Sequence, residues 1–394
     1  MSLSPIDMLK GFLVANITDE DKKALANNMW RTRTNALLEL GKEEDSDAVK
    51  AWLRSQYAKS IRERKKGATP GDFDRLGTQF HRWVRENDKE IGLKKSDNFF
   101  NYIEKDFQFY TQQYLRLRRA AQDLVLGLEE VFYNAKLEFT LQYPLLLAPL
   151  SPDDKEEALA TKLHVVATYI DIMLARRLWN FHSIAYSNMQ YAMFLVMKEI
   201  RRKPVSELVA ILSKKLADET ESFADNPRLR LHQQNNYAVH WLLARLTDSV
   251  EVSSGLPSHF KEYMAEGKER YEIEHIWANH PEWHADEFGH AADFAEYRNR
   301  IGGLLLLPKQ FNASYGDLPY KEKLPHYLKG NILTQSLHKD AYERNPEFLR
   351  FRDRENVPFE PYEDFKKAEI DKRQILYIKL AEILWNPNRL TVLE

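Results

Sequence analysis

The chain has 394 residues, which is long for one compact core, so two or three packed units are expected. With 43% hydrophobic and 29% charged residues, it can bury such cores and does not resemble a disordered polypeptide. Its 14 glycines argue against turn-rich β-sandwiches and propellers, and the lack of cysteine excludes disulfides, thiolate-held metals and thiol nucleophiles. The 57 basic residues are nearly balanced by 59 acidic ones, so the chain has little net charge. Any contact with nucleic acid must therefore come from a local basic patch.

Apolar residues recur at helical spacing from residue 4 to about residue 250, so this part of the chain is expected to be helical. The first helix is expected at Ser4-Pro5, in a segment without the basic start and unbroken apolar run of a signal peptide. Further helices are expected over residues 18–38, 49–61, 73–84, 99–117, 151–179, 186–201, 205–219 and 235–248. The longest apolar runs are too short for a membrane span, so we expect a cytoplasmic protein without a membrane partner.

The most basic stretch of the sequence begins within the second of these later helices and runs beyond it to residue 66. It contains Arg54, Lys59, Arg62, Arg64, Lys65 and Lys66. Six phosphate contacts would make binding to DNA steeply dependent on salt. The interpretation that we favour is a helix end, because basic residues are common in a last helical turn and Gly67 suits the position after it.

After residue 268 the pattern changes. Residues 271–276 alternate between apolar and polar side chains, and residues 304–307 are wholly apolar and end at Pro308. Both segments are expected to be short strands, the second of them buried. Helices are expected again from about residue 320, with a last one over residues 374–384. The predicted fold is therefore mainly α and multi-helical, with a small strand-containing unit in the C-terminal half.

Common catalytic motifs are missing from the sequence. It has no GxxxxGK phosphate loop, no GxGxxG, no GxSxG and no HExxH. The remaining cluster of chemically active residues starts at Glu274-His275. It continues with the run from Arg300 to Pro308, followed by Asn312, Tyr320 and Lys323. This region is the candidate functional site.

The cluster resembles the nuclease domain of GmrSD-type modification-dependent restriction endonucleases. The matching residues are Glu-His-Ile at 274–276, Arg-Ile-Gly-x-Leu-x-Leu-Leu-Pro at 300–308, Asn312, and the aromatic residue and lysine at 320 and 323. The resemblance implies an HNH, or His-Me finger, nuclease, in which two short strands and a helix form a ββα-metal unit around one divalent metal. Residues 3–10 are also similar to a late segment of the ParB-like nucleotide-binding domain that lies upstream in this family.

The resemblance implies two domains. Residues 1–204 would hold the end of the ParB-like sensor domain and a helical linker domain, and residues 205–394 the nuclease domain, with its ββα-metal core at about 268–330 and a helical tail. The implied function is a metal-dependent DNA endonuclease or nickase of a bacterial anti-phage restriction system, acting on base-modified phage DNA. The family's Asp-Gly-Gln-Gln-Arg nucleotide motif is absent, so a nucleotide-sensing domain or subunit is expected outside this chain.

The resemblance also assigns a role to each residue of the motif. His275 is the predicted general base, since a neutral imidazole with an ordinary pKa of about 6.5 can deprotonate water near neutral pH. Glu274 and the side-chain carbonyl of Asn312 are the predicted ligands of Mg²⁺ or Mn²⁺, which prefer oxygen. Arg300 and Lys323 are the predicted phosphate contacts or transition-state cations.

Four of these five residues have a structural alternative. A histidine at a strand end can be purely structural. Neighbours in a regular strand point to opposite faces, so Glu274 and His275 reach one metal only if the strand bends or bulges. Asn312 can cap the helix that follows it, and Lys323 can be an ordinary surface lysine.

Two positions depart from the family pattern. Gly303 stands where the family usually has Asn, and Ala278 where it usually has Pro. These departures motivate an alternative function, a non-catalytic helical binding or regulatory module with a decayed nuclease fold. A third possibility is a zinc hydrolase built on the histidine-rich loop that contains His280, His284 and His290.

Overall fold

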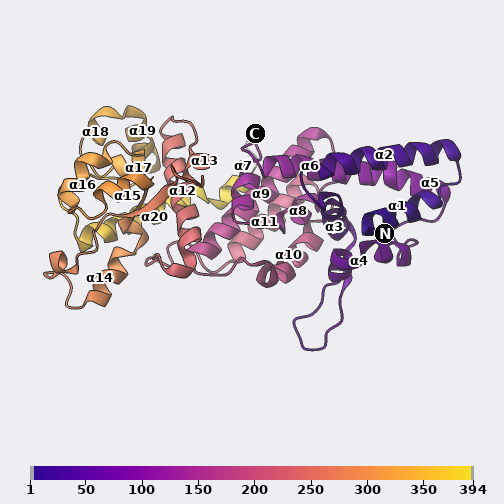
Figure 1. The fold of residues 1–394 in the computed structure, drawn as a ribbon, viewed down its shortest axis with the longest axis horizontal. Helices are drawn as coiled ribbons and strands as arrows, with labels where there is room; N and C mark the ends of the chain where they lie inside the picture. The colour runs from indigo at the N-terminus through magenta and orange to yellow at the C-terminus, as the bar shows by residue number, and fades with distance from the viewer. Residues whose placement is uncertain (1–3, 392–394) are drawn as a thin grey trace. The chain divides into compact units, whose positions relative to one another are not determined.

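The computed structural model describes residues 4–391 and is mainly helical, with one two-stranded sheet in that range. The predicted fold class is confirmed in this respect. The chain divides into two compact units (Figure 1): one takes in residues 1–174, 183–218 and 387–394, and the other residues 175–182 and 219–386. The domain boundary predicted after residue 204 falls inside the first unit. Leu3, which opens the ParB-like segment, lies outside the described residues.

The first unit is built from helices. They are α1 (Pro5–Ala15), α2 (Glu20–Leu38), α3 (Glu44–Tyr57), α4 (Asp72–Glu86), α5 (Ser96–Asn101), a π-helical segment (Tyr102–Phe107), α6 (Gln108–Ala120), α7 (Glu129–Lys136), α8 (Gln142–Leu147), α9 (Glu156–Trp179), α10 (Tyr186–Ile200) and α11 (Val205–Asp218). The last residues of α9, from residue 175, belong to the other unit. As predicted, Ser4 caps α1, because its hydroxyl accepts a hydrogen bond from the Asp7 amide at 3.2 Å. The segment 99–117, predicted to be helical, packs aromatic side chains into the core, where Phe107 and Tyr110 are fully buried.

Helix α9 is long and apolar enough to cross a membrane by length and composition, contrary to the expectation drawn from apolar runs. However, 78% of its most apolar window is buried inside the protein. Residues such as Leu163, Val166 and Ile170 are completely buried. Core helices of this kind pass the same test, and α9 serves here as a core helix.

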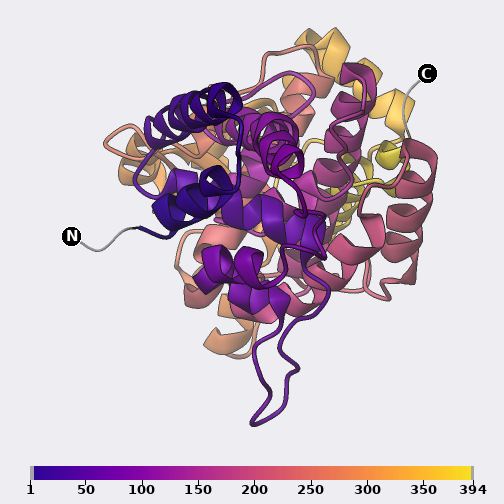
Figure 2. The ribbon, with the colours of Figure 1, turned by 90° about the vertical axis from the view of Figure 1, so that its right-hand side faces the viewer.

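The segment between α3 and α4 is a loop that projects from the first unit (Figures 1 and 2). The prediction that Lys65 and Lys66 end a helix is therefore wrong. Helix α3 already ends at Tyr57, because Arg201 binds backbone carbonyls that its end leaves unpaired. The Arg201 guanidinium donates to the carbonyl of Ser55 at 2.7 Å and to that of Ala58 at 2.9 Å.

The second unit holds the sheet. Its elements are α12 (Asn236–Ser253), α13 (Phe260–Tyr263), β1 (Tyr271–His275), α14 (Ala291–Arg298), a 3₁₀ turn (Ile301–Gly303), β2 (Leu304–Pro308), α15 (Lys309–Tyr315), α16 (Tyr320–Tyr327), α17 (Ile332–Gln335), α18 (Ala341–Arg344), α19 (Pro346–Glu355) and α20 (Lys367–Leu384). The strands pair antiparallel, from Tyr271 opposite Pro308 to His275 opposite Leu304. Both predicted strands are thus confirmed.

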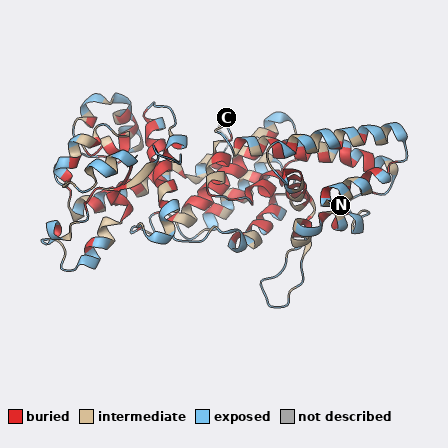
Figure 3. Cartoon of the chain, viewed as in Figure 1, coloured by how far each residue is buried: buried red, intermediate tan, exposed pale blue. Residues whose placement is uncertain are grey.

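The sheet is anchored by its apolar strand. Leu304 to Leu307 are at most 1% exposed, as expected for a strand that is covered on both faces. Figure 3 shows buried residues gathered in the interior of each unit, with exposed residues on the outer sides of helices and on loops. Helix α15 follows β2 directly and contacts both strands. The order of strand, strand and helix places the end of β1, and with it His275, beside a helix and a hydrophobic core that includes Ile276, Trp277 and Phe294.

Gly302 is required where the turn before β2 meets α20. A Cβ on Gly302 would lie 2.5 Å from the Ile370 carbonyl oxygen and 2.6 Å from the Gln374 nitrogen, both backbone atoms that cannot move aside. We expect Gly302→Ala to lower the free energy of unfolding by about 1–3 kcal/mol. Gly303→Ala is the matched control and should cost less than about 1 kcal/mol, since its Cβ would meet no atom closer than 3.4 Å. Urea unfolding of both variants tests this, and equal losses would contradict it.

Candidate active site

The candidate site lies at the C-terminal end of β1. The register of β1 is regular up to the pair of His275 and Leu304, without a bulge. Because side chains alternate along a strand, Glu274 and His275 point to opposite faces of the sheet. Glu274 is 3% exposed and His275 is partly exposed. The site therefore has two sides, one around the imidazole and one around the carboxylate.

The imidazole of His275 is oriented by Asn299, just beyond the end of α14. Its Nε2 lies 2.8 Å from the side-chain oxygen of Asn299, whose amide donates to the Ala295 carbonyl at 2.8 Å. With the oxygen of Asn299 facing the ring, Nε2 carries the proton and donates it. Nδ1 is then the acceptor, and within residues 4–391 it has no hydrogen-bond partner. A neutral imidazole in this tautomer can accept a proton at Nδ1.

The surroundings of His275 keep the imidazole neutral. Burial lowers its pKa to about 4, with further lowering by the charges of Arg298 and Lys323 and an opposing effect of the bond to Asn299. The ring is therefore uncharged at neutral pH. The Arg298 guanidinium is fixed by its Nε, which donates to the Trp277 carbonyl at 3.0 Å.

On the other side of the strand, Glu274 and Lys323 form a buried ion pair. Lys323 Nζ lies 2.7 Å from Glu274 Oε1, and these side chains are 0% and 3% exposed. The same ammonium donates to the His275 carbonyl at 2.9 Å, and the Tyr327 hydroxyl donates to Glu274 Oε1 at 3.1 Å. Burial raises the pKa of Glu274 and lowers that of Lys323, while their mutual attraction opposes both shifts. Two predicted site residues thus meet, and they join the backbone of a third.

Asn312 approaches β1 from α15. Its side-chain nitrogen donates a long hydrogen bond, 3.5 Å, to the Ile273 carbonyl. Its side-chain oxygen is buried and has no hydrogen-bond partner. A buried carbonyl oxygen without a partner is costly unless another group binds it, so this atom is suited to a cation.

Arg300 lies elsewhere. It is 6% exposed, and its two terminal nitrogens bind Glu296 at 2.9 Å and Asp371 at 3.1 Å. Its guanidinium also stacks 3.6 Å above the Tyr297 ring. In the described part of the chain, no contact links Arg300 to the other four predicted site residues. The structure therefore does not bring Arg300 to the imidazole.

Sequence reasoning missed two residues near His275, namely Asn299, which hydrogen bonds to its ring, and Arg298, whose charge lowers its pKa. Both stand directly before Arg300 in the Arg-Asn-Arg run that opens the second half of the motif. The run of three polar residues is visible in the sequence. Neither periodicity nor spacing, however, tells which of the three contacts His275, which lies 24 residues before Asn299. Arg298 has no carboxylate within ion-pair distance among residues 4–391, so its charge is available to a phosphate.

The donor atoms fit a hard divalent cation in part. The side-chain oxygen of Asn312 has no hydrogen-bond partner. The hydrogen bonds to the Glu274 side chain within residues 4–391 go to Oε1, which leaves Oε2 without one. Glu274 Oε1, however, is already neutralised by Lys323. Mg²⁺ usually keeps several waters and takes only one or two carboxylates from a protein. Glu274 and Asn312 are therefore the residues that would hold such an ion, with waters completing its coordination.

The histidine-rich loop has other partners. His280 stacks on Trp283 with ring centroids 4.0 Å apart and hydrogen bonds to Asp317 at 3.1 Å. His284 is buried against Trp277, with ring centroids 4.1 Å apart. Among residues 4–391, no group of three or more His, Asp or Glu side chains is placed to hold a metal ion. The zinc alternative therefore finds no support in the geometry.

A cavity of about 410 Å³ begins directly after β1, where Trp277 and Ala278 line it. Its other walls include Trp283, which is 42% exposed, and the lysines Lys321 and Lys366. Aromatic faces stack on nucleobases, and lysines bind phosphates. This cavity is therefore suited to part of a nucleotide chain near the end of β1, although His275 itself does not line it.

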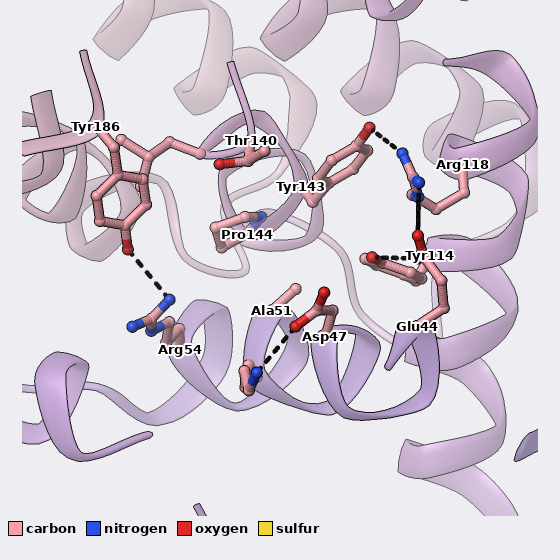
Figure 4. A pocket seen from close by; sticks show the side chains of 12 residues that line it. Glu44, Asp47, Ala51, Arg54, Tyr114, Arg118, Thr140, Tyr143, Pro144 and Tyr186 are labelled. Atoms are coloured by element: carbon pink, nitrogen blue, oxygen red, sulfur yellow. Dashed lines mark hydrogen bonds and ion pairs between the residues drawn. The ribbon is translucent and has the colours of Figure 1, made fainter. Parts of the chain in front are cut away.

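Another cavity, of about 270 Å³, lies within the first unit between α3, α6 and α8 (Figure 4). Most of its charged side chains are already paired. Arg118 binds Glu44 at 2.6 Å, and Lys50 binds Asp47 at 2.9 Å. None of the predicted site residues lines this cavity. It is thus a polar pocket of the first unit and no part of the candidate active site.

Comparison with known proteins identifies a family that this region of the chain resembles. Residues 216–380 match the family model of GmrSD restriction endonucleases, C-terminal domain. No curated protein matches the chain. The matched range covers less than half of the chain but contains β1, β2, α15 and all five predicted site residues. The resemblance drawn from the sequence motifs is thereby confirmed: residues 216–380 are similar to the C-terminal domain of GmrSD restriction endonucleases.

Proposed function

We propose that this chain is a metal-dependent DNA endonuclease or nickase of the HNH type and that β1, β2 and α15 form its ββα-metal unit. The observation that carries the proposal is the neutral, oriented imidazole of His275 at the end of β1. Its Nε2 is held at 2.8 Å from Asn299, so that Nδ1 is left as the proton acceptor. The family match of residues 216–380 supports hydrolysis of DNA as the reaction.

In the proposed reaction, His275 removes a proton from the attacking water. The water oxygen attacks phosphorus, the bond to the leaving 3′ oxygen breaks, and that oxygen takes up a proton. A bound Mg²⁺ or Mn²⁺ would supply positive charge for a nonbridging oxygen and the leaving oxygen. Asn312 would provide its unpartnered oxygen to that ion. Glu274 points away from the face of β1 that carries the imidazole, so its Oε2 would serve an ion beside His275 only if the end of β1 bends.

The cationic side chains divide into two roles. Arg298, half-buried and without a carboxylate partner in the described residues, is the proposed phosphate contact on the imidazole side. Lys323 is fully buried, and it holds the end of β1 through Glu274 and the His275 carbonyl. Its predicted contact with phosphate requires that it leave this pair. Arg300, bound to Glu296 and Asp371, is proposed to position Asn299 and the turn before β2.

The biological setting follows from the family alone. It implies an anti-phage restriction system in the bacterial cytoplasm, base-modified phage DNA as the target, and a nucleotide-sensing domain or subunit that acts with this chain. No residue of the described site distinguishes a modified base from an ordinary one.

Nicking of supercoiled plasmid tests the proposal directly. We expect the purified chain to convert supercoiled plasmid or phage DNA to the open-circular form with Mg²⁺ or Mn²⁺, and to stop when EDTA is added. Equal nicking in EDTA would contradict the dependence on metal. Failure to nick unmodified and modified DNA alike, together with no heat of Mg²⁺ binding in calorimetry, would favour the non-catalytic module instead.

A second experiment addresses the orientation of His275. Asn299→Ala removes the acceptor of the Nε2 proton, so the ring loses its preferred tautomer and rotamer. We expect the single-turnover nicking rate to fall about tenfold, since part of the general-base contribution depends on this orientation. Asn279→Ala is the matched control, because Asn279 is exposed and follows β1 by four residues.

The tautomer itself provides a readout that a merely structural role would not change. Nitrogen NMR of the His275 ring should show the Nε2–H tautomer in the wild type and in Asn279→Ala, and a mixture in Asn299→Ala. An unchanged ring spectrum with an unchanged rate would remove Asn299 from the site.

A further inference from the structure

The loop between α3 and α4, residues 59–71, is a strongly basic projection that we call the basic arm. It carries Lys59, Arg62, Arg64, Lys65 and Lys66 against a single acidic residue, Glu63. Figures 1 and 2 both show it extending away from the helices of its unit. The whole chain has a formal net charge of −2, so this local excess of positive charge is a distinct feature.

The base of the basic arm is fixed by hydrogen bonds to the first turn of α4. The Asp72 carboxylate accepts from the Lys59 amide at 2.9 Å, and the Asp74 carboxylate accepts from the Arg62 amide at 2.7 Å and the Gly71 amide at 2.9 Å. The two sides of the loop approach so closely that a Cβ on Gly71 would lie 2.6 Å from the Ile61 nitrogen. The base of the arm is therefore a fixed part of the first unit.

Helix α10 supports the basic arm from a second direction. Lys198 donates to the Lys59 carbonyl at 3.0 Å, and Arg64 donates to the Asn188 carbonyl at 2.7 Å. The Arg64 guanidinium also lies 5.6 Å from the centre of the Tyr191 ring. Three segments of the fold thus hold the arm: the end of α3, the start of α4 and α10.

The pocket of the first unit adds a further support at the base. Arg54, which lines that pocket, donates through Nε to the Phe73 carbonyl at 2.9 Å and reaches the Tyr186 hydroxyl at 3.2 Å (Figure 4). The Phe73 amide in turn donates to the Ser60 carbonyl of the arm at 2.9 Å. Gly77 leaves room for this guanidinium, since a Cβ there would lie 1.9 Å from it.

The tip of the basic arm presents its charges to solvent. The Lys65 amide donates to the Glu63 carbonyl at 2.8 Å, and Gly67, with φ at +81°, turns the chain back. Lys65 pairs with Glu63, but Arg62 and Lys66 are exposed and form no ion pair with any residue in the range 4–391. Two uncompensated cations therefore stand on the anchored loop, Arg62 near its base and Lys66 at its tip.

We propose that the basic arm binds the phosphate backbone of double-stranded DNA, without reading its sequence, and that Arg62 and Lys66 make the contacts. The identity of the polymer rests on the proposed function. No large hydrophobic side chain of residues 59–71 is exposed, so the arm lacks the apolar anchors that protein interfaces use. Regularly spaced phosphates are the partner that suits closely spaced cations, and such contacts position a protein on DNA.

The test is the salt dependence of binding by the full chain. Fluorescence anisotropy with a labelled duplex is measured in EDTA from 50 to 200 mM salt, so that no hydrolysis interferes. For the double variant Arg62→Ala/Lys66→Ala we expect the slope of log K against log salt to lose about 1.8 units, roughly 0.9 for each contact. Affinity should fall by the same factor for duplexes of unrelated sequence.

Two control variants separate contact from net charge. Lys42→Ala/Lys94→Ala removes the same charge from exposed lysines of the same unit and should leave the slope unchanged. Arg62→Lys/Lys66→Arg keeps both charges and should keep the wild-type slope. An equal change in both alanine pairs, or no change in either, would overturn the proposal. Tighter binding of an RNA duplex through the same two residues would also overturn it, in favour of RNA.

The same preparations distinguish this proposal from the proposed function. If the arm binds DNA, Arg62→Ala/Lys66→Ala raises the DNA concentration needed for half-maximal nicking but keeps the single-turnover rate at saturating DNA. If only the nuclease assignment is wrong, the change in salt slope remains although no variant nicks DNA. If only the arm assignment is wrong, nicking remains with an unchanged DNA requirement.

Discussion

Replacing His275 with alanine lowers the metal-dependent nicking rate by about 100-fold or more, which is the lower end of what a general base contributes. The loss is expected because Nδ1 of the Asn299-bound ring is the proton acceptor that the site offers to water. The fold should survive the change. His275 is only partly exposed, but its side chain makes one hydrogen bond, to Asn299, and its backbone remains to pair with β2 and to accept from Lys323.

The measurement is the single-turnover rate at saturating DNA with Mg²⁺. His280→Ala serves as the control, because His280 lies in the neighbouring loop, contacts Trp283 and Asp317, and has no place in the proposed reaction. We expect that variant to stay within a factor of about two of the wild type, because exposed substitutions away from a site change little. If the His275→Ala variant nicks DNA at the wild-type rate, His275 is not the general base, and the general base of the proposed nuclease is then a different, unidentified group.

The architecture could largely be predicted from local pattern. Two strands were predicted correctly, one from the alternation of apolar and polar side chains up to His275 and one from the apolar run from Leu304 to Leu307. Helical spacing predicted the bounds of α9, α10, α11 and α12 to within a few residues. These signals are local because each reports which face of one element is buried. The helix end predicted at Lys66 was wrong for a non-local reason. Arg201, which follows α10, hydrogen bonds to the free backbone carbonyls at the end of α3, so the helix ends nine residues earlier.

The sequence could predict which residues belong to the candidate site, but not which of their side chains contact one another. His275 and Asn312 were identifiable from the motif, and the structure leaves a proton acceptor on one and an unpartnered oxygen on the other. The ion pair between Glu274 and Lys323, which are 49 positions apart, depends on how α16 packs against β1. The burial of Arg300 depends on Asp371 of α20 in the same way. Sequence spacing carries no information on such contacts.

The pair of Glu274 and Lys323 leads to the largest expected effect on stability. Lys323→Met removes the ammonium and leaves a carboxylate that is 3% exposed without its counter-charge. Breaking one partner of a buried ion pair typically costs about 3–5 kcal/mol. We expect a loss of that size in the unfolding free energy of the second unit. Lys321→Met is the matched control on the same helix, and because Lys321 is exposed it should change stability by less than about 0.5 kcal/mol.

Urea unfolding gives the free energies, and hydrogen exchange of the β1 and β2 amides shows whether the loss is centred on the sheet. The double variant Glu274→Gln/Lys323→Met separates pairing from packing. The amide introduced by Glu274→Gln is neutral and can still accept from the Tyr327 hydroxyl, so the double variant should be more stable than Lys323→Met alone. A double variant as unstable as the sum of its single changes would show that the two side chains contribute independently, and it would remove the ion pair as the element that holds the end of β1.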